Sequence, residues 1–561
     1  MASAAASARP PPVPAADTVV RETVLLAAAS ALLFSITATH FELRVTDVGA
    51  LLVSEGRVPY RDFWTIYAPG SFYATAAAFR LLGRELLVSN LLGIAVSTAS
   101  VAAYHRFVRA VLPAQLAAAA TLVVAAAFFA TGYHDGLTSY PLASLGWFVA
   151  FGRLVRPSAV RRVRDLALAG AALGVAIACK HDVAGYAILA AAFALLAEPD
   201  PARPLRARLG EVAILAGGAA AVIAPCLLLL VAAGAGPDLW SDLVIFPAGI
   251  FPYVRWEELP LLPRLSRDPL ELFHRLRVWV MVYGPVTAAL VAGGVLLRRS
   301  ARLDPAARRA ALLAGAMLVP CTLATRVQIN THAITLPALA ALLVGLALAL
   351  GAGAAPRERR RTRLVWALAA ISAAVYLVEP AFTLGLRWSD GVEPVGLPGL
   401  RGIRATHADA AAFRALSAAI AAAEPAEAPF LFVSRRNDVV PHASDLVAWL
   451  TPRRLVGRYP ELHPGVADTR AVQQEIVAAA EAGPPPVVVR EHRYPDAPLA
   501  ALGARYRSHV EIDSPLLDEW LAAHYRSGRL FAVGEVSYEV MRRVNPASSA
   551  SPGASTTTPS S

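Results

Sequence analysis

The sequence predicts an α-helical polytopic membrane protein with about eleven transmembrane helices and a small α/β domain at its C-terminal end. Three observations predict this fold class. Of the 561 residues, 56% are apolar and only 17% are charged, whereas soluble proteins average about 25% charged residues. The mean hydropathy of +0.50 excludes a purely soluble enzyme and a mainly disordered chain. Arginines fall in alternate short loops between the apolar runs, which is typical of membrane proteins with a fixed orientation.

The membrane domain is expected at residues 21–385, after a Pro/Ala-rich and disordered tail at residues 1–20. A transmembrane helix needs roughly 20 mostly apolar residues. Candidate spans occupy residues 22–40, 86–104, 113–131, 138–155, 166–179, 183–197, 211–235, 278–297, 310–325, 332–351 and 363–382. Two of these runs, 166–179 and 183–197, are short, which leaves the number of spans uncertain by about two.

The basic residues predict how the helices are oriented. Arginines occupy five alternate loops, at residues 106–109, 153–164, 203–208, 298–309 and 357–363. Because such loops stay in the cytoplasm, we expect a cytoplasmic N-terminus and an extracytoplasmic C-terminal domain, in a bacterial inner (plasma) membrane. The net charge of +11 is then mainly an orientation signal. Membrane lipids are the expected partners, and nucleic acid is not.

The outer face should carry two longer loops, at residues 41–85 and 236–277, and the C-terminal block at 386–545. In that block, short apolar runs at 430–433 and 487–489 alternate with helical patterns at 444–450, 469–482 and 516–525. This alternation predicts a small α/β domain. Residues 546–561, rich in Ser, Thr, Pro and Gly, are expected to form a disordered tail.

The first outer loop contains the residues that most suggest chemistry. Glu42 and Asp47 follow the first span directly, and Tyr60, Asp62 and Tyr67 follow in an aromatic-rich stretch. An acid beside aromatic side chains at the membrane surface suits an interfacial pocket for a lipid or a sugar. The alternative is that the aromatic residues only anchor the loop in the membrane, and that Asp47 is an interfacial acid or a helix N-cap.

Residues 56–63 (G-R-V-P-Y-R-D-F) and 67–73 (Y-A-P-G-S-F-Y), together with the preceding acid, resemble the GT-C superfamily of membrane glycosyltransferases. The chain looks like the bacterial members of glycosyltransferase family 39, which are similar to protein O-mannosyltransferases and lipid A aminoarabinose transferases. The resemblance is specific over residues 42–85 and weaker to about residue 200. It implies transfer of a sugar from a polyprenyl-phosphate donor to an acceptor hydroxyl of a lipid, glycan or protein on the outer face.

The resemblance also implies that Asp47 is the general base. Such a reaction needs a carboxylate within about 3 Å of the attacking hydroxyl, and cations or hydrogen-bond donors for the departing phosphate. The family often shows two adjacent acids, but here Val48 follows Asp47 and Glu42 lies five residues earlier. Glu42 is therefore a second catalytic candidate, with an ion pair to Arg44 as its alternative role.

Two short outer loops add further candidates. His134 and Asp135 occupy the first, where the family often places a second acid, although Asp-Gly is also a strong turn dipeptide. Lys180, His181 and Asp182 occupy the second. Ionisable residues in so apolar a stretch are costly unless they line a cavity or reach the interface.

Three basic residues are candidates for binding the donor phosphate. Lys180, the one lysine among 52 Lys and Arg residues, is the first, with Asp182 orienting it. A lysine that snorkels to the membrane surface is the alternative. Arg255 and Arg326 are the others, and outer arginines also bind lipid headgroups. No metal-binding spacing such as HExxH occurs, so no cofactor is assigned and a divalent cation stays an open alternative.

Three functions were compared. A glycosyltransferase explains why acids follow the first, third and fifth spans. A transporter or flippase of lipid-linked saccharides is the alternative, but transporters place polar or broken segments near the middle of paired spans, whereas these ionisable residues lie at one face. A membrane scaffold leaves the acids unexplained. The glycosyltransferase is the preferred prediction.

Overall fold

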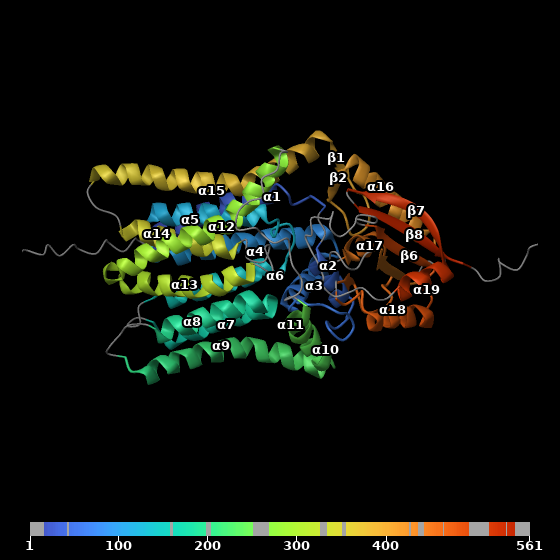
Figure 1. Ribbon diagram of the computed structural model, residues 1–561, viewed down its shortest axis with the longest axis horizontal. Coiled ribbons are helices and arrows are strands. Elements are labelled where there is room, and N and C mark those ends of the chain that lie inside the picture. The colour runs from blue at the N-terminus through green and yellow to red at the C-terminus, as the bar shows by residue number, and fades with distance from the viewer. Residues whose placement is uncertain are drawn as a thin grey trace, which may run out of the picture.

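The computed structural model describes residues 16–41, 44–156, 161–197, 203–250, 269–325, 334–350, 355–423, 425, 428–435, 442–463, 465–492, 515–534 and 536–544. A bundle of long helices forms one half of the molecule, and a sheet covered by helices forms the other (Figure 1). The predicted tail at 546–561 and most of the tail at 1–20 lie outside the described residues.

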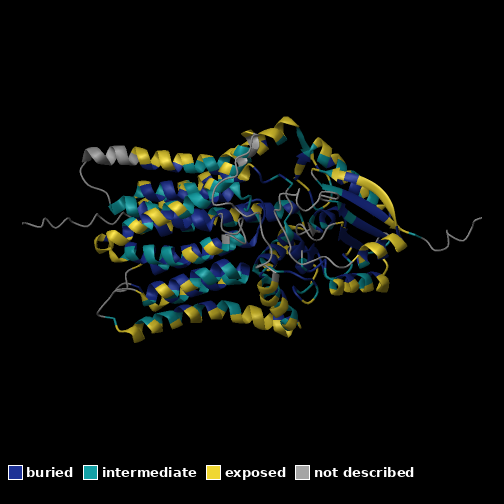
Figure 2. Cartoon of the chain, viewed as in Figure 1, coloured by how far each residue is buried: buried dark blue, intermediate teal, exposed yellow. Residues whose placement is uncertain are grey.

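Every predicted span coincides with a helix of the bundle. These helices are α1 (Ala16–Ser35), α4 (Leu86–Arg109), α5 (Ala114–Ala130), α6 (Ser139–Leu154), α7 (Val163–Cys179), α8 (His181–Leu196), α9 (Leu205–Ala232), α12 (Pro269–Arg298), α13 (Pro305–Thr325), α14 (Thr335–Leu350) and α15 (Ala355–Ser389). A 3₁₀ turn, η2 (Ser300–Arg302), separates α12 from α13. The bundle interior is buried, whereas α9 and α15 are largely exposed along its sides (Figure 2).

Several helix ends differ from the prediction. Helix α1 begins at Ala16, inside the predicted tail at 1–20; α12 begins at Pro269, inside the predicted loop at 236–277; and α15 runs to Ser389, beyond residue 385. The physical reason is the same in each case. Hydropathy marks only the apolar part of a helix, whereas charged residues such as Arg275 and Arg387 favour the helix and extend it beyond that part.

Within the described residues, six helices are long and apolar enough to cross a membrane: Ala16–Ser35, Leu86–Arg109, Leu205–Ala232, Arg275–Arg298, Pro305–Ala324 and Arg363–Ser389. The remaining bundle helices have 16 or 17 residues. At about 1.5 Å per residue they are somewhat shorter than the roughly 30 Å hydrocarbon layer. Eleven crossings therefore remain the prediction, while the eleven helices themselves are observed.

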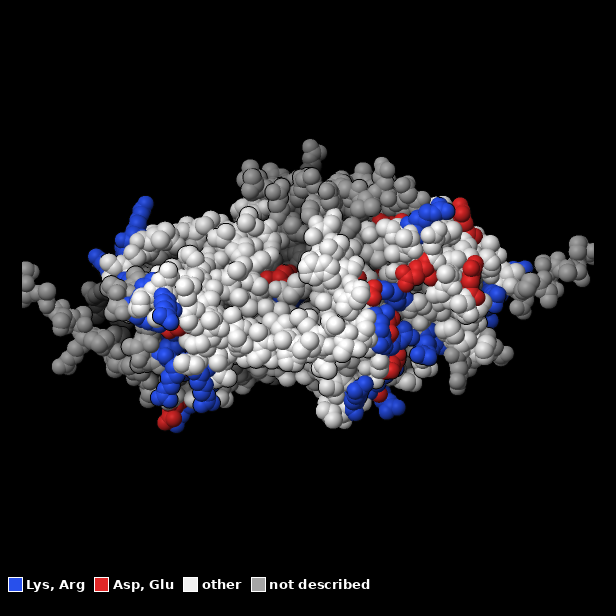
Figure 3. Space-filling model, turned by 90° about the horizontal axis from the view of Figure 1, so that it is seen from below, with Lys and Arg blue, Asp and Glu red and all other residues white. Residues whose placement is uncertain are grey.

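The arginine-rich loops gather at one end of the bundle, and the sheet domain lies at the opposite end (Figures 1 and 3). Between these ends, the face in Figure 3 shows a band nearly free of charged atoms. Some loop arginines also tie helices together: Arg153 and Arg156 each contact Asp165 at 3.1 Å, and Arg161 and Arg203 each contact Glu211 at 2.5 Å. These arginines therefore also join neighbouring helices of the bundle.

Short helices fill the two outer loops. The first loop contains α2 (Val45–Ser54) and α3 (Gly70–Leu82), and the second contains α10 (Gly236–Trp240), the π-helical turn η1 (Ser241–Ile245) and α11 (Phe246–Ile250). They lie between the bundle and the sheet domain (Figure 1). Helix α2 has ten residues and spans about 15 Å, which is too short to cross a bilayer.

The C-terminal block is the predicted α/β domain. Its main sheet has the order β3-β6-β8-β7, in which β3 (Phe430–Ser434) and β6 (Val487–His492) are parallel and β7 (Tyr525–Val533) and β8 (Val536–Arg543) are antiparallel. Two small sheets pair β1 (Val392–Pro394) with β2 (Arg404–Thr406) and β4 (His442–Ala443) with β5 (Glu461–Leu462). The covering helices are α16 (His407–Ala421), α17 (Asp445–Leu450), α18 (Arg470–Ala482) and α19 (Leu516–His524).

The sheet domain shares its hydrophobic core with the first outer loop. Leu51 of α2, Phe79 of α3 and Leu86 of α4 are buried in the same cluster as the strand residues. Backbone hydrogen bonds cross the boundary, from Leu86 N to Gly399 O at 2.8 Å and from Trp64 N to Arg458 O at 2.7 Å. The domain therefore holds α2 and α3, and the acid that α2 carries, in fixed positions against the bundle.

Candidate functional site

Asp47 lies in the first turn of α2 and is 1% exposed. Arg44, not Asp47, is the N-cap residue of this helix, so capping does not explain the acid. Ser89 of α4 donates a hydrogen bond to Asp47 Oδ1 at 2.5 Å, whereas Oδ2 is buried and has no hydrogen-bond partner among the described residues. Burial raises the pKa of Asp47 to about 6, opposed by the Ser89 hydrogen bond and the charge of Arg44.

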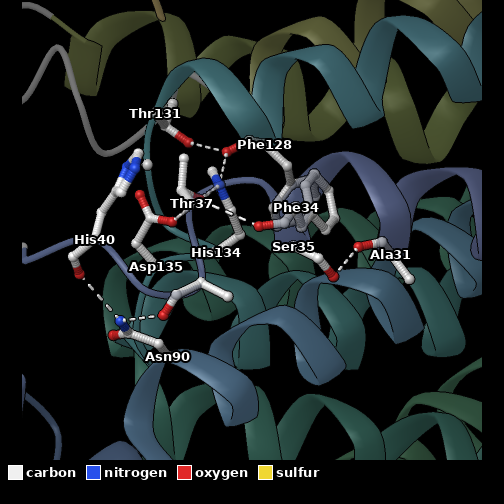
Figure 4. A network of polar contacts seen from close by, with 12 residues as sticks. Ala31, Phe34, Ser35, Thr37, His40, Asn90, Phe128, Thr131, His134 and Asp135 are labelled. Atoms are coloured by element: carbon white, nitrogen blue, oxygen red, sulfur yellow. Dashed lines mark hydrogen bonds and ion pairs between the residues drawn. The ribbon is translucent and has the colours of Figure 1, made fainter. Parts of the chain in front are cut away.

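Asp135 lies in the turn between α5 and α6 and is 4% exposed. Thr37 donates a hydrogen bond to Asp135 Oδ1, and His134 Nε2 lies 3.1 Å from the same oxygen (Figure 4). Burial favours the protonated acid, but the His134 contact, the charge of Arg44 and the Thr37 hydrogen bond outweigh it and hold the pKa of Asp135 below its ordinary value. Asp135 is therefore a fixed negative charge.

The His134 ring is held on all sides. It stacks between Phe34 and Phe129, with ring centroids 4.9 Å away in both cases. Nδ1 lies 3.3 Å from the Phe128 carbonyl oxygen, and Nε2 lies 2.8 Å from Thr37 Oγ1 and 3.1 Å from Asp135 Oδ1. Figure 4 shows this group beside His40 and Asn90.

Arg44 links the two acids. Its guanidinium donates to the Gly132 carbonyl in the turn that carries Asp135, and its charge lowers the pKa of both Asp47 and Asp135. Sequence reasoning did not select Arg44 as a site residue. The available signal was its place three residues before Asp47, directly after the first predicted span.

Lys180 connects α7 to α8 at the outer end of the bundle and is 7% exposed. Its Nζ lies 3.3 Å from Asp182, 5.8 Å from the centre of the Tyr67 ring and 5.3 Å from that of Tyr140. Tyr140 in turn stacks on Tyr133 at 4.4 Å, and the charges of Arg44 and Lys180 both act on Tyr133. The Tyr133–Tyr140 pair thus connects Lys180 to the Arg44 side of the site.

His181 is the first residue of α8, next to Lys180, and its Nδ1 is buried without a hydrogen-bond partner among the described residues. The polar residues at this end of the bundle form one group, which we call the outer polar cluster: Arg44, Asp47, Tyr67, Ser89, Tyr133, His134, Asp135, Tyr140 and Lys180.

Seen from below, the surface is hollowed near the middle of the molecule, and acidic atoms lie inside that hollow (Figure 3).

Other predicted site residues have different surroundings. Tyr60 is fully buried, has a φ of 70°, and donates a hydrogen bond to the Tyr67 carbonyl at 2.8 Å. Asp62 accepts hydrogen bonds from Val58 N and Arg61 at 2.7 Å, within its own turn. Tyr60 is thus a core residue that supports Tyr67, and Asp62 stabilises the loop. Trp64 and Phe72 are also buried, so they do not form a membrane-facing aromatic belt.

Glu42, Arg255 and Arg326 lie outside the described residues. Among the residues that the structure describes, no three His, Cys, Asp or Glu side chains are arranged to hold a metal ion. A bound divalent cation therefore remains a prediction.

The second outer loop meets the sheet domain beside the cluster. Arg458 lies 3.0 Å from Asp238 and 3.9 Å from Asp242. Phe246 packs edge-on against Trp64 at 5.2 Å and His463 at 5.4 Å. Burial raises the pKa of Asp242 to about 7 against the opposing charge of Arg458. We call this contact of Arg458, His463 and Trp64 with the second outer loop the Arg458 seam.

The structure was compared with known proteins. No protein-family model and no curated protein matches the chain. Among solved structures, the chain is similar to ArnT from Cupriavidus metallidurans bound to undecaprenyl phosphate, with 15% identity and a TM-score of 0.55 over 94% of this chain and 98% of that chain. The apo form of the same protein gives 15% identity and 0.56 over 96% and 100%. The likeness confirms the GT-C fold.

Proposed function

We propose that the chain is an integral membrane glycosyltransferase that moves a sugar from a polyprenyl-phosphate donor to an acceptor hydroxyl on the outer face. The observation that supports this best is the outer polar cluster. It contains two buried acids, Asp47 with a raised pKa and Asp135 with a lowered pKa. It also contains two cations, the buried Lys180 and the half-buried Arg44. ArnT, which has the same fold, is described with bound undecaprenyl phosphate.

Asp47 is the proposed general base. Its Oδ1 is held by Ser89, and Oδ2 has no partner in the part of the chain that the structure describes, so Oδ2 is the atom that accepts the proton of the acceptor hydroxyl. As that proton leaves, the acceptor oxygen forms a bond to the anomeric carbon and the bond from that carbon to the phosphate oxygen breaks. The sugar is transferred with inversion, and the polyprenyl phosphate leaves with the bonding electrons. A pKa near 6 suits a base that works near neutral pH.

Lys180 is the proposed ligand of the phosphate. It is a buried cation at the bundle end, held by Asp182 and by the faces of two tyrosines. A charged hydrogen-bond donor stabilises the negative charge that develops on the leaving phosphate. Arg44 is a second donor of the same kind, and Arg255 and Arg326 remain further candidates. Tyr67 and His181 then line the sugar pocket, and Asp135 with His134 fixes Arg44.

The arginine-rich end of the bundle is proposed to face the cytoplasm of a bacterial cell, with the sheet domain outside. The sheet domain and the Arg458 seam are proposed to shape the side from which the acceptor arrives, because both adjoin α2. The chemistry of the cluster fits an acceptor hydroxyl of a lipid, a glycan or a protein.

The test is sugar transfer by the detergent-solubilised full chain, with a pool of radiolabelled polyprenyl-phosphate sugars as donors and cell-envelope extract as the source of acceptors. Asp47→Asn should lower the rate about 10²–10⁴-fold. Asp390→Asn, an exposed acid at the end of α15, is the matched control and should leave it unchanged. Transfer that survives Asp47→Asn would assign the base elsewhere, with Asp135 next. Absence of transfer, with sugar-lipid flipping in liposomes, would favour the transporter alternative.

A further inference from the structure

Ser89 lies between the two acidic parts of the site. It is in the first turn of α4 and is fully buried. Its hydroxyl donates to Asp47 Oδ1 at 2.5 Å and accepts a hydrogen bond from Leu137 N at 3.4 Å, in the turn that carries Asp135. One side chain thus contacts both α2 and the α5–α6 turn.

The direction of the Ser89 proton follows from this arrangement. A serine hydroxyl has one hydrogen to donate and lone pairs to accept with. An ionised carboxylate can only accept and the Leu137 amide can only donate, so the Ser89 hydrogen must point at Asp47. The two oxygens of Asp47 therefore differ: Oδ1 is fixed, and Oδ2 is buried and unpartnered among the described residues.

Two glycines bring the turn close enough for this contact. A Cβ added at Gly93 of α4 would lie 2.5 Å from the Gly136 carbonyl carbon and 2.8 Å from its nitrogen, so only glycine allows this approach of backbones. A Cβ added at Gly136 would lie 3.2 Å from Arg44 Cδ and 3.5 Å from Ser89 Oγ. The contact between Gly93 and Gly136 thus sets the distance at which Ser89 and Arg44 meet the turn.

We propose that Ser89 is a positioning residue that orients Asp47, leaving Oδ2 as its reactive atom, and that couples Asp47 to the turn carrying Asp135. The effect of Ser89 on catalysis rests on the proposed function of Asp47 as the base. The effect of Ser89 on the protonation of the Asp47 carboxyl group does not depend on that function. The charged group that acts on Asp47 is Arg44, at the start of its own helix, and Arg44 also acts on Asp135. Ser89 is the neutral contact from α4.

The experiment measures protonation of Asp47 directly, by its reaction with dicyclohexylcarbodiimide between pH 5 and 9 and mass spectrometry of the Asp47 peptide. Ser89→Ala removes the hydrogen bond to the carboxylate, so the midpoint of labelling should rise by about one pH unit. Ser89→Cys keeps a similar volume with a weak donor and should also raise it, whereas Ser89→Thr keeps the hydroxyl and should restore it. Ser97→Ala is the matched control, because Ser97 is also fully buried on α4 but its hydroxyl contacts no hydrogen-bond partner within the described segments.

Transfer activity supplies the second measurement. In Ser89→Ala the acid limb of the pH–rate profile should move upward with the labelling midpoint, and kcat should fall about tenfold or more with little change in KM. An unchanged midpoint in both Ser89→Ala and Ser89→Cys would overturn the proposal. A shifted midpoint in a protein whose Asp47→Asn variant remains active would uphold the coupling and refute Asp47 as the base.

Discussion

Asp47 and Asp135 are both buried and both feel the charge of Arg44, yet their pKa values move in opposite directions. The difference comes from their hydrogen bonds. Thr37 and His134 both contact Asp135, whereas the Asp47 carboxylate receives one hydrogen bond from the described residues, that of Ser89. A carboxylate with several donors stays ionised, and a buried one with few donors is protonated more easily. Two acids tuned apart in this way can serve as a fixed charge and as a proton acceptor.

The pH dependence of transfer follows from Asp47. A general base must be ionised, and the pKa of Asp47 is raised to about 6. We expect kcat/KM to fall about tenfold per pH unit below pH 6 and to level off above it. The measurement is kcat/KM between pH 4.5 and 8.5 at constant donor concentration. Asp135, whose pKa is lowered, should not titrate in this range. A profile that stays flat down to pH 4.5 would contradict this role of Asp47.

The ionised form of Asp47 should also lower the free energy of unfolding. Its pKa is raised from 3.8 to about 6, so the folded protein binds the proton more tightly than the unfolded chain, and stability falls as pH rises from about 4 to 6. Above pH 6 the cost is of order 3 kcal/mol. Asp47→Asn should therefore melt at a higher temperature than wild type at pH 8 and at a similar one near pH 4. A lower Tm of this variant at pH 8 would show that Asp47 stabilises the fold.

Lys180 is expected to act on the donor. Lys180→Met keeps the stem of the side chain but removes its charge from the site beside Tyr67 and Tyr140. The KM for the polyprenyl-phosphate sugar should rise about 10–100-fold, because a hydrogen bond between charged groups is lost. Lys180→Arg is the matched control and should retain most of the binding. Equal KM values for Lys180→Met and wild type would place the phosphate elsewhere.

The sequence was sufficient to locate the bundle helices, because each helix contains an apolar segment that can be recognised from hydropathy alone. It was also sufficient to place Asp47, Asp135 and Lys180 at one end, because alternating loop charge determines which helix ends lie together. It could not show that Arg44 and Ser89 connect the acids. Those contacts are made by residues from three separate segments, and a serine at the start of an apolar helix carries no pattern of its own.

Tyr60 and Asp62 show what local sequence does not reveal about a loop. Both belong to the stretch that carries the family resemblance, and both were expected in the substrate pocket. In the structure, Tyr60 is buried in a cluster with Leu230, and Asp62 accepts a hydrogen bond from Val58 N within its own turn. A loop that holds α2 in place needs its own core, and local sequence does not distinguish a residue of that core from one facing a substrate.

Gly93 should be intolerant of even a methyl group. Gly93→Ala places a Cβ within 2.8 Å of the Gly136 backbone, which must move and take the Asp135 turn with it. We expect a loss of transfer of about 10²-fold from this displacement and a lower Tm. Gly217→Ala is the matched control, because it is also helical and no atom lies within 4 Å of an added Cβ. A fully active Gly93→Ala variant would mean that the spacing of this turn is not critical.

The seam at Arg458 should be sensitive to pH. Arg458→Ala leaves Asp242, which is 3% exposed, without its nearest cation. Because the pKa of Asp242 is raised to about 7, the acid is mostly ionised at pH 8 and mostly protonated at pH 6. Removal of Arg458 should cost about 1–3 kcal/mol at pH 8, since a buried carboxylate loses a polar partner, and clearly less at pH 6, where its charge is mostly absent.

A double-mutant cycle separates this effect from loss of packing. Asp242→Asn removes the charge permanently, so Arg458→Ala in the Asp242→Asn background should cost less at pH 8 than it does in wild type. Asp238, the other partner of Arg458 at 3.0 Å, is unchanged in both backgrounds and its contribution cancels. Thermal unfolding in detergent at pH 6 and pH 8 gives all the required values. If the cost is the same at both pH values and in both backgrounds, Arg458 holds the second outer loop by contacts other than its charge on Asp242.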